Sequence, residues 1–178
     1  MNLMMLLEMA ASGYGDRVAV QDGNERLTYT ELFSAAGAAA AEIRKSGCDR
    51  AAMLDVSTLA LPVALFASAW SGVPFVPLSY RLTEDELDGL LERIVPAYLV
   101  TDDERARALS NKRGTTLVRR EQFLQHARAS DAGEAAWPMD PEDIAVLLFT
   151  SGTTGAPKAA VLRQRPRSPP GRALPGPP

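Results

Sequence analysis

Short apolar runs alternate with helix-forming stretches along most of this chain, and this alternation limits the folds that the chain can adopt. Apolar runs of strand length recur at residues 51–56, 75–78, 97–101 and 145–150. The stretches between most of them carry apolar residues at helical spacing, with hydroxyl residues before them and glycine or proline after them. Strands that alternate with helices are typical of a parallel sheet with helices on its faces. The sequence therefore predicts an α/β fold with a mainly parallel sheet and flanking helices.

Local signals predict where several of these helices begin and end. Thr30 is expected to cap a helix that runs through the alanine-rich stretch after it, and Gly47 is expected to stop that helix. Thr83 followed by Glu86 forms a capping-box pattern before a second helix. Upstream, the segment 22–24 (Asp-Gly-Asn) is a turn signal that joins two short strands into a hairpin.

Composition excludes several classes of function. The chain has 178 residues, a formal net charge of -3 and 46% hydrophobic residues, which suits one domain or part of a larger one. A mildly acidic chain gives no reason to expect nucleic acid as a partner. Cys48 is the only cysteine, so no intrachain disulfide can form and a reducing compartment is expected. The longest apolar run, residues 59–70, is shorter than the ~20 residues that a membrane span needs. We therefore expect a cytoplasmic protein without a membrane span.

Residues that often carry catalysis are scarce. His126, the only histidine, is expected on the surface of a short polar helix. Asp102, Asp103 and Glu104 are adjacent, but this pattern is more typical of a solvated loop or helix start than of a metal site. Cys48 lies in a predicted turn and is interpreted as a structural cysteine. The sequence therefore assigns no catalytic residue and no metal ligand to this chain.

The apolar run 145–149 stops at a cluster of hydroxyl residues and glycines that closes with a lysine. Polyphosphate oxygens require several hydrogen-bond donors, a close approach of the backbone and a cation. Glycine permits the close approach, hydroxyl groups add donors, and lysine supplies a compact positive charge. We therefore predict a polyphosphate-binding loop formed by Thr150, Ser151, Gly152, Thr153, Thr154, Gly155 and Lys158.

This loop differs from the Walker pattern, in which Gly-Lys-Ser/Thr opens a helix. Here Lys158 follows Pro157, and residues 159–162 have the composition of a strand. The sequence therefore predicts a phosphate-binding loop between two strands, without the architecture of P-loop NTPases.

Three segments resemble the AMP-forming adenylating enzymes, a superfamily of acyl-CoA synthetases, adenylation domains of peptide synthetases, and luciferases. The segment Thr150-Ser-Gly-Thr-Thr-Gly-Ala-Pro-Lys158 is similar to their signature loop and is the most specific of the three; Ala159 stands where the family usually has glycine. Two further segments, 27–32 (Leu-Thr-Tyr-Thr-Glu-Leu) and 72–83, resemble other parts of the family pattern. The resemblance covers about residues 1–162 and implies an incomplete AMP-binding domain, namely the N-terminal part of the family's large domain.

The resemblance implies an acyl-CoA synthetase, or fatty-acid–CoA ligase, that uses ATP and Mg2+ to activate a carboxylic acid. The acyl-adenylate would then react with the thiol of coenzyme A, and residues 150–155 with Lys158 would hold the ATP phosphates. The remaining family site residues lie beyond this loop, so the resemblance implies a truncated chain that is inactive alone, with a complementing C-terminal polypeptide as a partner. The alternatives are a fragment of an amino-acid or aryl-acid adenylation domain, and a non-catalytic relic or partner-binding fragment.

The residues from 163 to 178 break the alternating pattern. Six of them are proline, four are arginine and none is acidic. Such a segment cannot bury enough apolar surface to fold, so we expect it to be disordered. An abrupt change of this kind is what a shifted reading frame in GC-rich DNA produces, which is the hypothesis that we prefer. The alternative is a proline-rich docking tail or a basic anchor.

Overall fold

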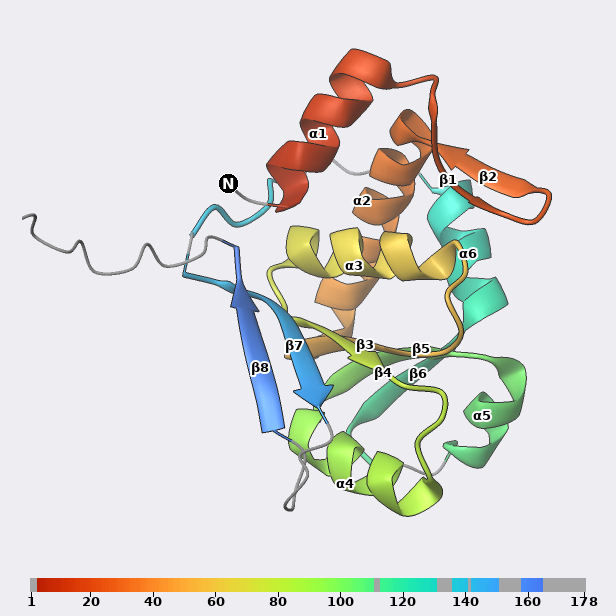
Figure 1. Ribbon diagram of the computed structural model, residues 1–178, viewed down its shortest axis with the longest axis vertical. Coiled ribbons are helices and arrows are strands. Elements are labelled where there is room, and N and C mark those ends of the chain that lie inside the picture. Colours follow the sequence, from red (N-terminus) through yellow and green to blue (C-terminus); the bar gives the residue numbers. More distant parts are fainter. Residues whose placement is uncertain (1–2, 111–112, 131–135, 141, 151–157, 165–178) are drawn as a thin grey trace, which may run out of the picture.

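A six-stranded sheet forms the middle of three layers, with helices on both of its faces (Figure 1). This computed structural model describes residues 3–110, 113–130, 136–140, 142–150 and 158–164. The helices are α1 (Leu3–Tyr14), α2 (Tyr29–Ser46), α3 (Ala60–Ser71), α4 (Glu84–Ile94), α5 (Asp103–Ala108) and α6 (Arg120–Ala129). Helices α1, α2, α3 and α6 lie on one side of the sheet, and α4 and α5 lie on the other. In the described ranges, no helix has the length and apolar character needed to cross a lipid bilayer.

The sheet is parallel except at one edge. Its strands are β3 (Arg50–Leu54), β4 (Phe75–Leu78), β5 (Ala97–Thr101), β6 (Thr115–Arg119), β7 (Ile144–Thr150) and β8 (Lys158–Arg163). They lie in the order β6-β5-β3-β4-β7-β8, and every neighbouring pair is parallel except β7–β8. A separate antiparallel hairpin, β1 (Val18–Asp22) with β2 (Glu25–Thr28), precedes α2. The predicted α/β fold with a mainly parallel sheet is confirmed.

The central strands send alternate side chains into two apolar cores. On β3, Ala51 and Met53 join the core formed with α2 and α3, whereas Ala52 and Leu54 join the core formed with α4. All residues of β5 are buried. Because helices cover both faces, these strands read in the sequence as continuous apolar runs rather than as alternating polar and apolar residues.

The contact between α2 and α3 depends on small side chains. Alanine lets helix axes approach closely because it adds little volume between the two backbones. The buried alanines of α2 are Ala35, Ala36, Ala38, Ala39 and Ala40. An aromatic cluster closes one end of this contact, where ring centroids lie 4.8 Å apart for Phe33–Trp70 and 5.3 Å apart for Trp70–Trp137. This cluster also attaches the segment 136–140 to the helical layer.

Helix α2 begins earlier than the sequence analysis predicted, and the assignment of Thr30 as its cap is wrong. The N-cap is Thr28, whose hydroxyl accepts a hydrogen bond from the Glu31 amide at 3.2 Å, while the Glu31 carboxylate accepts one from the Thr28 amide at 2.7 Å. Strand β2 ends at Thr28, so the reciprocal pair can form there and the helix starts at once. The capping box of Thr83 and the left-handed C-cap at Gly47 (φ 67°) are both confirmed.

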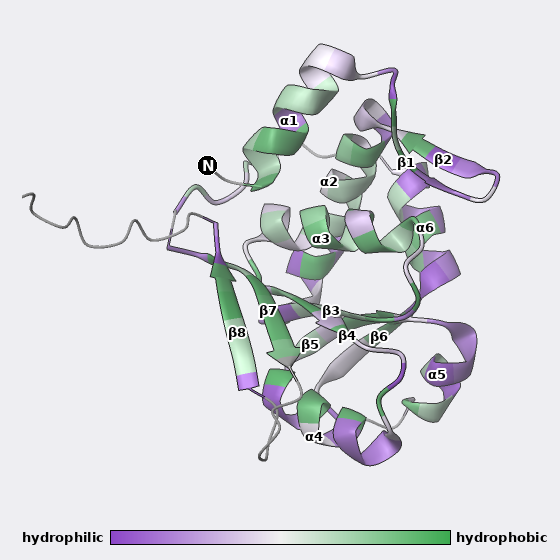
Figure 2. Cartoon of the chain, viewed as in Figure 1, coloured by the Kyte–Doolittle hydropathy of each residue, from purple (hydrophilic) through white to green (hydrophobic). Residues whose placement is uncertain are grey.

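Strand β8 is an exposed edge of the sheet. All of its residues are exposed, including the apolar Val161 and Leu162, whose exposed fractions are 46% and 48%. Figure 2 shows that apolar residues dominate this strand, with its hydrophilic ends at Lys158 and Arg163. Exposed apolar edge strands are templates for pairing with other chains. The structure therefore has one strongly apolar edge.

The corrected helix start gives a test of local stability. We expect Thr28→Ala to lower the free energy of unfolding by about 1 kcal/mol, because it leaves amides of the first turn without their capping acceptor. Thr30→Ala is the matched control and should change this free energy by less than about 0.5 kcal/mol. Urea unfolding of both variants measures the difference, and an equal loss in the two would contradict the assignment of the cap.

The exposed edge gives a test of solubility. We expect poor solubility of the isolated chain, and we expect Val161→Lys to raise it because a charge in the middle of β8 hinders pairing of edge strands. Leu6→Lys on α1 is the matched control, since Leu6 is exposed to the same extent, 46%. Light scattering of concentrated samples measures the effect. Equal behaviour of the two variants would show that the strand edge is not the source of aggregation.

Candidate functional site

The carboxyl ends of the parallel strands meet at one edge of the sheet, which is where ligands usually bind in folds of this kind. The residues that lie at or directly after these ends are mostly polar. They are Asp55 after β3, Ser79 after β4, Asp102 after β5, Arg119 at the end of β6 and Thr150 at the end of β7. The sheet thus places the first residue of the predicted phosphate loop among other polar groups.

The hairpin of β7 and β8 holds the two ends of the predicted loop together. Thr150 lies directly opposite Lys158 in the antiparallel ladder, so their Cα atoms are about 4.5–5.5 Å apart. The predicted ligands Ser151, Gly152, Thr153, Thr154 and Gly155 lie outside the described residues. The structure thus confirms that a strand precedes the loop and another follows it, and it brings Thr150 and Lys158 to one place.

The two faces of this hairpin have different surroundings. Side chains alternate between the two faces of a strand, so Lys158 lies on the face opposite to that of Ala159 and its ladder partner Phe149. Phe149 packs against the core that contains α4. Lys158 is exposed. The lysine is thus presented on the face of the hairpin that is directed away from α4.

Arginines at the carboxyl edge are engaged in ion pairs with neighbouring carboxylates. The Nη1 atom of Arg120 donates to both carboxylate oxygens of Asp55 at 3.0 Å, and its Nη2 atom donates to Glu121 at 2.7 Å. The Asp55 side chain is only 3% exposed. Arg119 pairs with Asp103 at 3.3 Å. These pairs join the loops after β3, β5 and β6, so the arginines stabilise the edge on which the hairpin lies.

Hydrogen bonds set the ionisation of two carboxylates in this network. Burial disfavours the charged form of Asp102, but hydrogen bonds from the amide and guanidinium of Arg105 outweigh it, so the pKa of Asp102 lies below its usual range. The hydrogen bond from Arg120 lowers the pKa of Glu121. Both groups therefore stay ionised near neutral pH, which suits a structural role and not a proton-transfer role.

An open hollow of about 640 Å³ adjoins this network on the side of α6. Its lining carries three acidic residues, Asp22, Glu25 and Glu121, against two arginines, Arg120 and Arg128, which pair with Glu121 and Glu25. A surface with an excess of acidic groups does not attract a polyanion. The hollow therefore does not replace the hairpin as the candidate polyphosphate site.

The residues to which the sequence analysis assigned no catalytic role make contacts that stabilise the fold. They are His126, Cys48 and Asp102. His126 lies on α6 with its side chain half exposed, 3.6 Å from Glu42. Cys48 is buried, with its sulfur 3.5 Å from the hydroxyl of Thr116. Asp102 caps α5. Within the part of the chain that the structure describes, no group of three or more histidine, cysteine or acidic residues could hold a metal ion.

Sequence reasoning missed the partly buried ion pair of Asp55 and Arg120. These residues lie far apart in the sequence, and only the adjacency of the β3 and β6 loops around β5 brings them together. The single available signal was an acidic residue directly after a buried strand, a position at which parallel sheets place functional or edge-stabilising groups.

Comparisons with known proteins agree with this geometry. The model of the AMP-binding enzyme family matches residues 7–167 of the chain. The chain belongs to the AMP-binding enzyme family. Its fold is that of the N-terminal part of adenylate-forming enzymes.

Several relatives within the AMP-binding enzyme family are known. A feruloyl-CoA synthase of an Amycolatopsis species is 33% identical over 147 residues, which are 81% of this chain and 30% of that protein. Surfactin synthase subunit 3 of Bacillus subtilis strain 168 is 29% identical over 157 residues, 85% of this chain and 12% of that protein. The structure of a Mycobacterium tuberculosis fatty acyl CoA synthetase superposes with a TM-score of 0.79 at 20% identity, over 92% of this chain and 34% of that one. The chain thus spans less than a third of the length of the feruloyl-CoA synthase and of surfactin synthase subunit 3.

The contribution of the Asp55–Arg120 ion pair to stability can be tested in this member of the AMP-binding family. We expect Arg120→Met to lower the free energy of unfolding by about 2 kcal/mol, because the Asp55 carboxylate loses its cation and keeps the hydrogen bond from the Val56 amide. Arg119→Met is the matched control: its pair with Asp103 is exposed, so the loss should stay below about 1 kcal/mol. Urea unfolding measures both, and equal losses would show that Asp55 does not depend on Arg120.

Proposed function

We propose that this chain carries the ATP polyphosphate-binding hairpin of an acyl-CoA synthetase, with Thr150, Ser151, Gly152, Thr153, Thr154, Gly155 and Lys158 as phosphate ligands. The observation that carries the proposal is the ladder position of Thr150 opposite Lys158 at the carboxyl edge of a parallel sheet. Membership of the AMP-binding family supports nucleotide as the source of the phosphates.

The chemical roles follow from the residue types. Amides and hydroxyl groups of residues 150–155 donate hydrogen bonds to phosphate oxygens, and Lys158 places its ammonium beside them. In the proposed reaction, a carboxylate oxygen of the acid substrate bonds to the α-phosphorus while the bond to the bridging oxygen breaks, so that pyrophosphate leaves. Lys158 would stabilise the charge on the departing pyrophosphate.

The donors of the hairpin fit phosphate oxygens and not a metal ion, because hydroxyl, amide and ammonium groups are not a set of carboxylate ligands. Mg2+ would therefore reach this site bound to ATP. It would supply further neutralisation of the phosphate charge. Coenzyme A is the proposed acyl acceptor.

The acyl-CoA synthetase class is supported by the similarity to a feruloyl-CoA synthase and to a fatty acyl CoA synthetase. The second candidate is an amino-acid adenylation domain, and the similarity to surfactin synthase subunit 3 favours it. We further propose that a complementing polypeptide completes the enzyme and pairs with β8, whose residues are all exposed. The remaining alternative is a non-catalytic fragment that binds a partner.

A nucleotide titration tests the phosphate site. We expect Lys158→Ala to weaken ATP binding about ten-fold, equivalent to ~1.4 kcal/mol, and to leave AMP binding unchanged. AMP lacks the outer phosphates, so the lysine should distinguish the two nucleotides. Lys45→Ala is the matched control, since Lys45 is an 80% exposed lysine paired with Glu42 on α2. Calorimetry measures the affinities.

Three results of this titration would count against the proposal. They are an absence of ATP binding by the unaltered chain, an equal affinity of the Lys158→Ala variant for ATP, and an equal loss in the Lys45→Ala control. A separate measurement addresses the enzyme class. We expect no ATP–pyrophosphate exchange by the isolated chain with fatty, aryl or amino acids, and exchange with amino acids alone would favour the second candidate.

A further inference from the structure

The end of the hairpin nearest the loop lies beyond the ladder position that joins β7 to β4. Strand β7 pairs with β4 at one ladder position, Phe75 with Val146, which lies near the start of β7. Beyond this position, β7 continues to Thr150 with β8 as its ladder partner, and β8 is itself an exposed edge. Side-chain contacts with the layer beneath it therefore contribute to the position of the loop-bearing end.

One of these contacts joins the hairpin to α4. The guanidinium carbon of Arg93 lies 5.0 Å from the centroid of the Phe149 ring, within the range of a cation–π interaction. Phe149 directly precedes Thr150, and Figure 1 shows α4 beside the end of the hairpin that carries the loop. Phe149 and Leu147 also pack against the core that contains α4. This contact therefore acts where the ladder with β4 has ended.

The position of Arg93 on α4 strengthens this contact. Arg93 is in the last turn of the helix, where the carbonyl ends of the backbone favour a cation. It is also the only basic residue of α4, whose other charged residues are Glu84, Asp85, Glu86, Asp88 and Glu92. An acidic helix beside an anion-binding loop would repel a polyphosphate, and Arg93 places a positive charge at the end of the helix nearest the hairpin.

Arg93 and Lys158 lie on opposite sides of the hairpin. Arg93 lies over Phe149, on the face of the hairpin that packs on α4, whereas Lys158 lies on the opposite face. Arg93 is thus placed to fix the hairpin and not to share phosphate oxygens with Lys158. We propose that Arg93 is a positioning residue, which holds the loop-bearing end of the β7–β8 hairpin on α4. Its effect on nucleotide affinity rests on the proposed function, and its effect on the hairpin does not.

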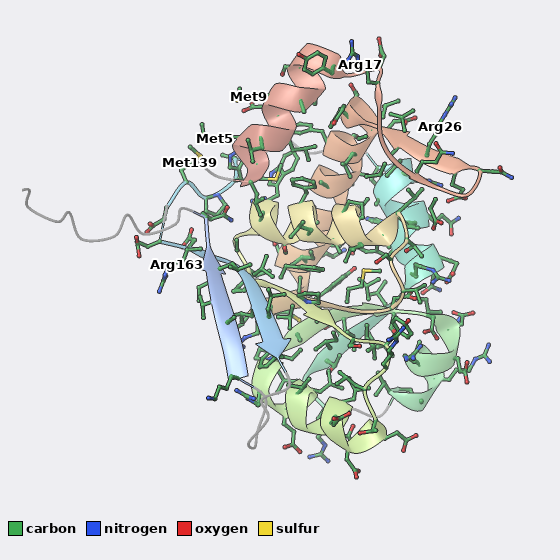
Figure 3. The ribbon with its side chains drawn as sticks, viewed as in Figure 1. Met5, Met9, Arg17, Arg26, Met139 and Arg163 are labelled. Atoms are coloured by element: carbon green, nitrogen blue, oxygen red, sulfur yellow. The ribbon has the colours of Figure 1, made fainter. Side chains whose placement is uncertain are left out.

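Substitutions of Arg93 test the two parts separately. Arg93→Met removes the cation and keeps the apolar stem, and Arg93→Lys keeps a cation. Arg17→Met is the matched control, because Arg17 makes the same kind of contact with Tyr14 at 4.9 Å and lies at the end of the molecule away from α4 (Figure 3). Hydrogen exchange of the β7 and β8 amides measures the hold on the hairpin, with α6 amides as an internal reference. Calorimetry measures the affinity of each variant for ATP.

We expect Arg93→Met to speed exchange of the β7 and β8 amides about two-fold to five-fold and to weaken ATP binding by a similar factor. Exchange of the α6 amides should not change. Arg93→Lys should change the β7 and β8 exchange rates and the ATP affinity less than Arg93→Met does. Arg17→Met should match the unaltered chain in both measurements. Unchanged exchange in β7 and β8 would overturn the proposal that Arg93 holds the hairpin, and faster exchange with unaltered ATP affinity would overturn its effect on nucleotide binding. If the unaltered chain bound no ATP, the proposed function would fail, while the exchange rates would still decide whether Arg93 holds the hairpin.

Discussion

Burial of both faces of a parallel sheet is the constraint on which the other features of this structure depend. Parallel strands need crossover connections, and the connecting helices cover the sheet on both sides. Strand β5 illustrates the result, since every one of its side chains is buried. The alanines of α2 let α3 approach closely on one face, and the leucines of α4 fill the other face. This arrangement directs all carboxyl ends of the parallel strands to one edge, which is where the polar groups gather.

The polar edge and the hairpin have different sources of stability. Ion pairs such as Asp55–Arg120 lock the loops after β3 and β6 together. The hairpin of β7 and β8 has the sheet on one side only, and its loop-bearing end contacts α4 through Phe149 and Arg93. A phosphate-binding loop must approach and release a charged ligand, and elements that do so are drawn from the less stable parts of a fold. The fold thus combines an edge joined by ion pairs with a hairpin whose loop-bearing end is held by β8 and by contacts with α4.

The candidate site could be proposed from the sequence because its chemistry is local. Residues 150–158 are contiguous, so the glycines, hydroxyl residues and lysine appear together in one string. The strands on either side of the string were also predicted, and the structure has them as β7 and β8. The helix start at Thr28 was missed although it too is local, because Thr30 and Thr28 are both suitable caps. Only the partner at Glu31 and the end of β2 distinguish the two.

The sequence by itself indicated most of the order of strands and helices along the chain, the capping box at Thr83 and the family, because each of these is written in neighbouring residues. The phosphate-binding loop is a prediction from the same kind of local pattern. The tertiary structure alone decided that Asp55 pairs with Arg120, that Arg93 lies over Phe149, and that β8 is an exposed edge. These contacts join residues that are distant in the chain. Their existence depends on the order of strands in the sheet and on which face each side chain occupies, and no local pattern of residues encodes either.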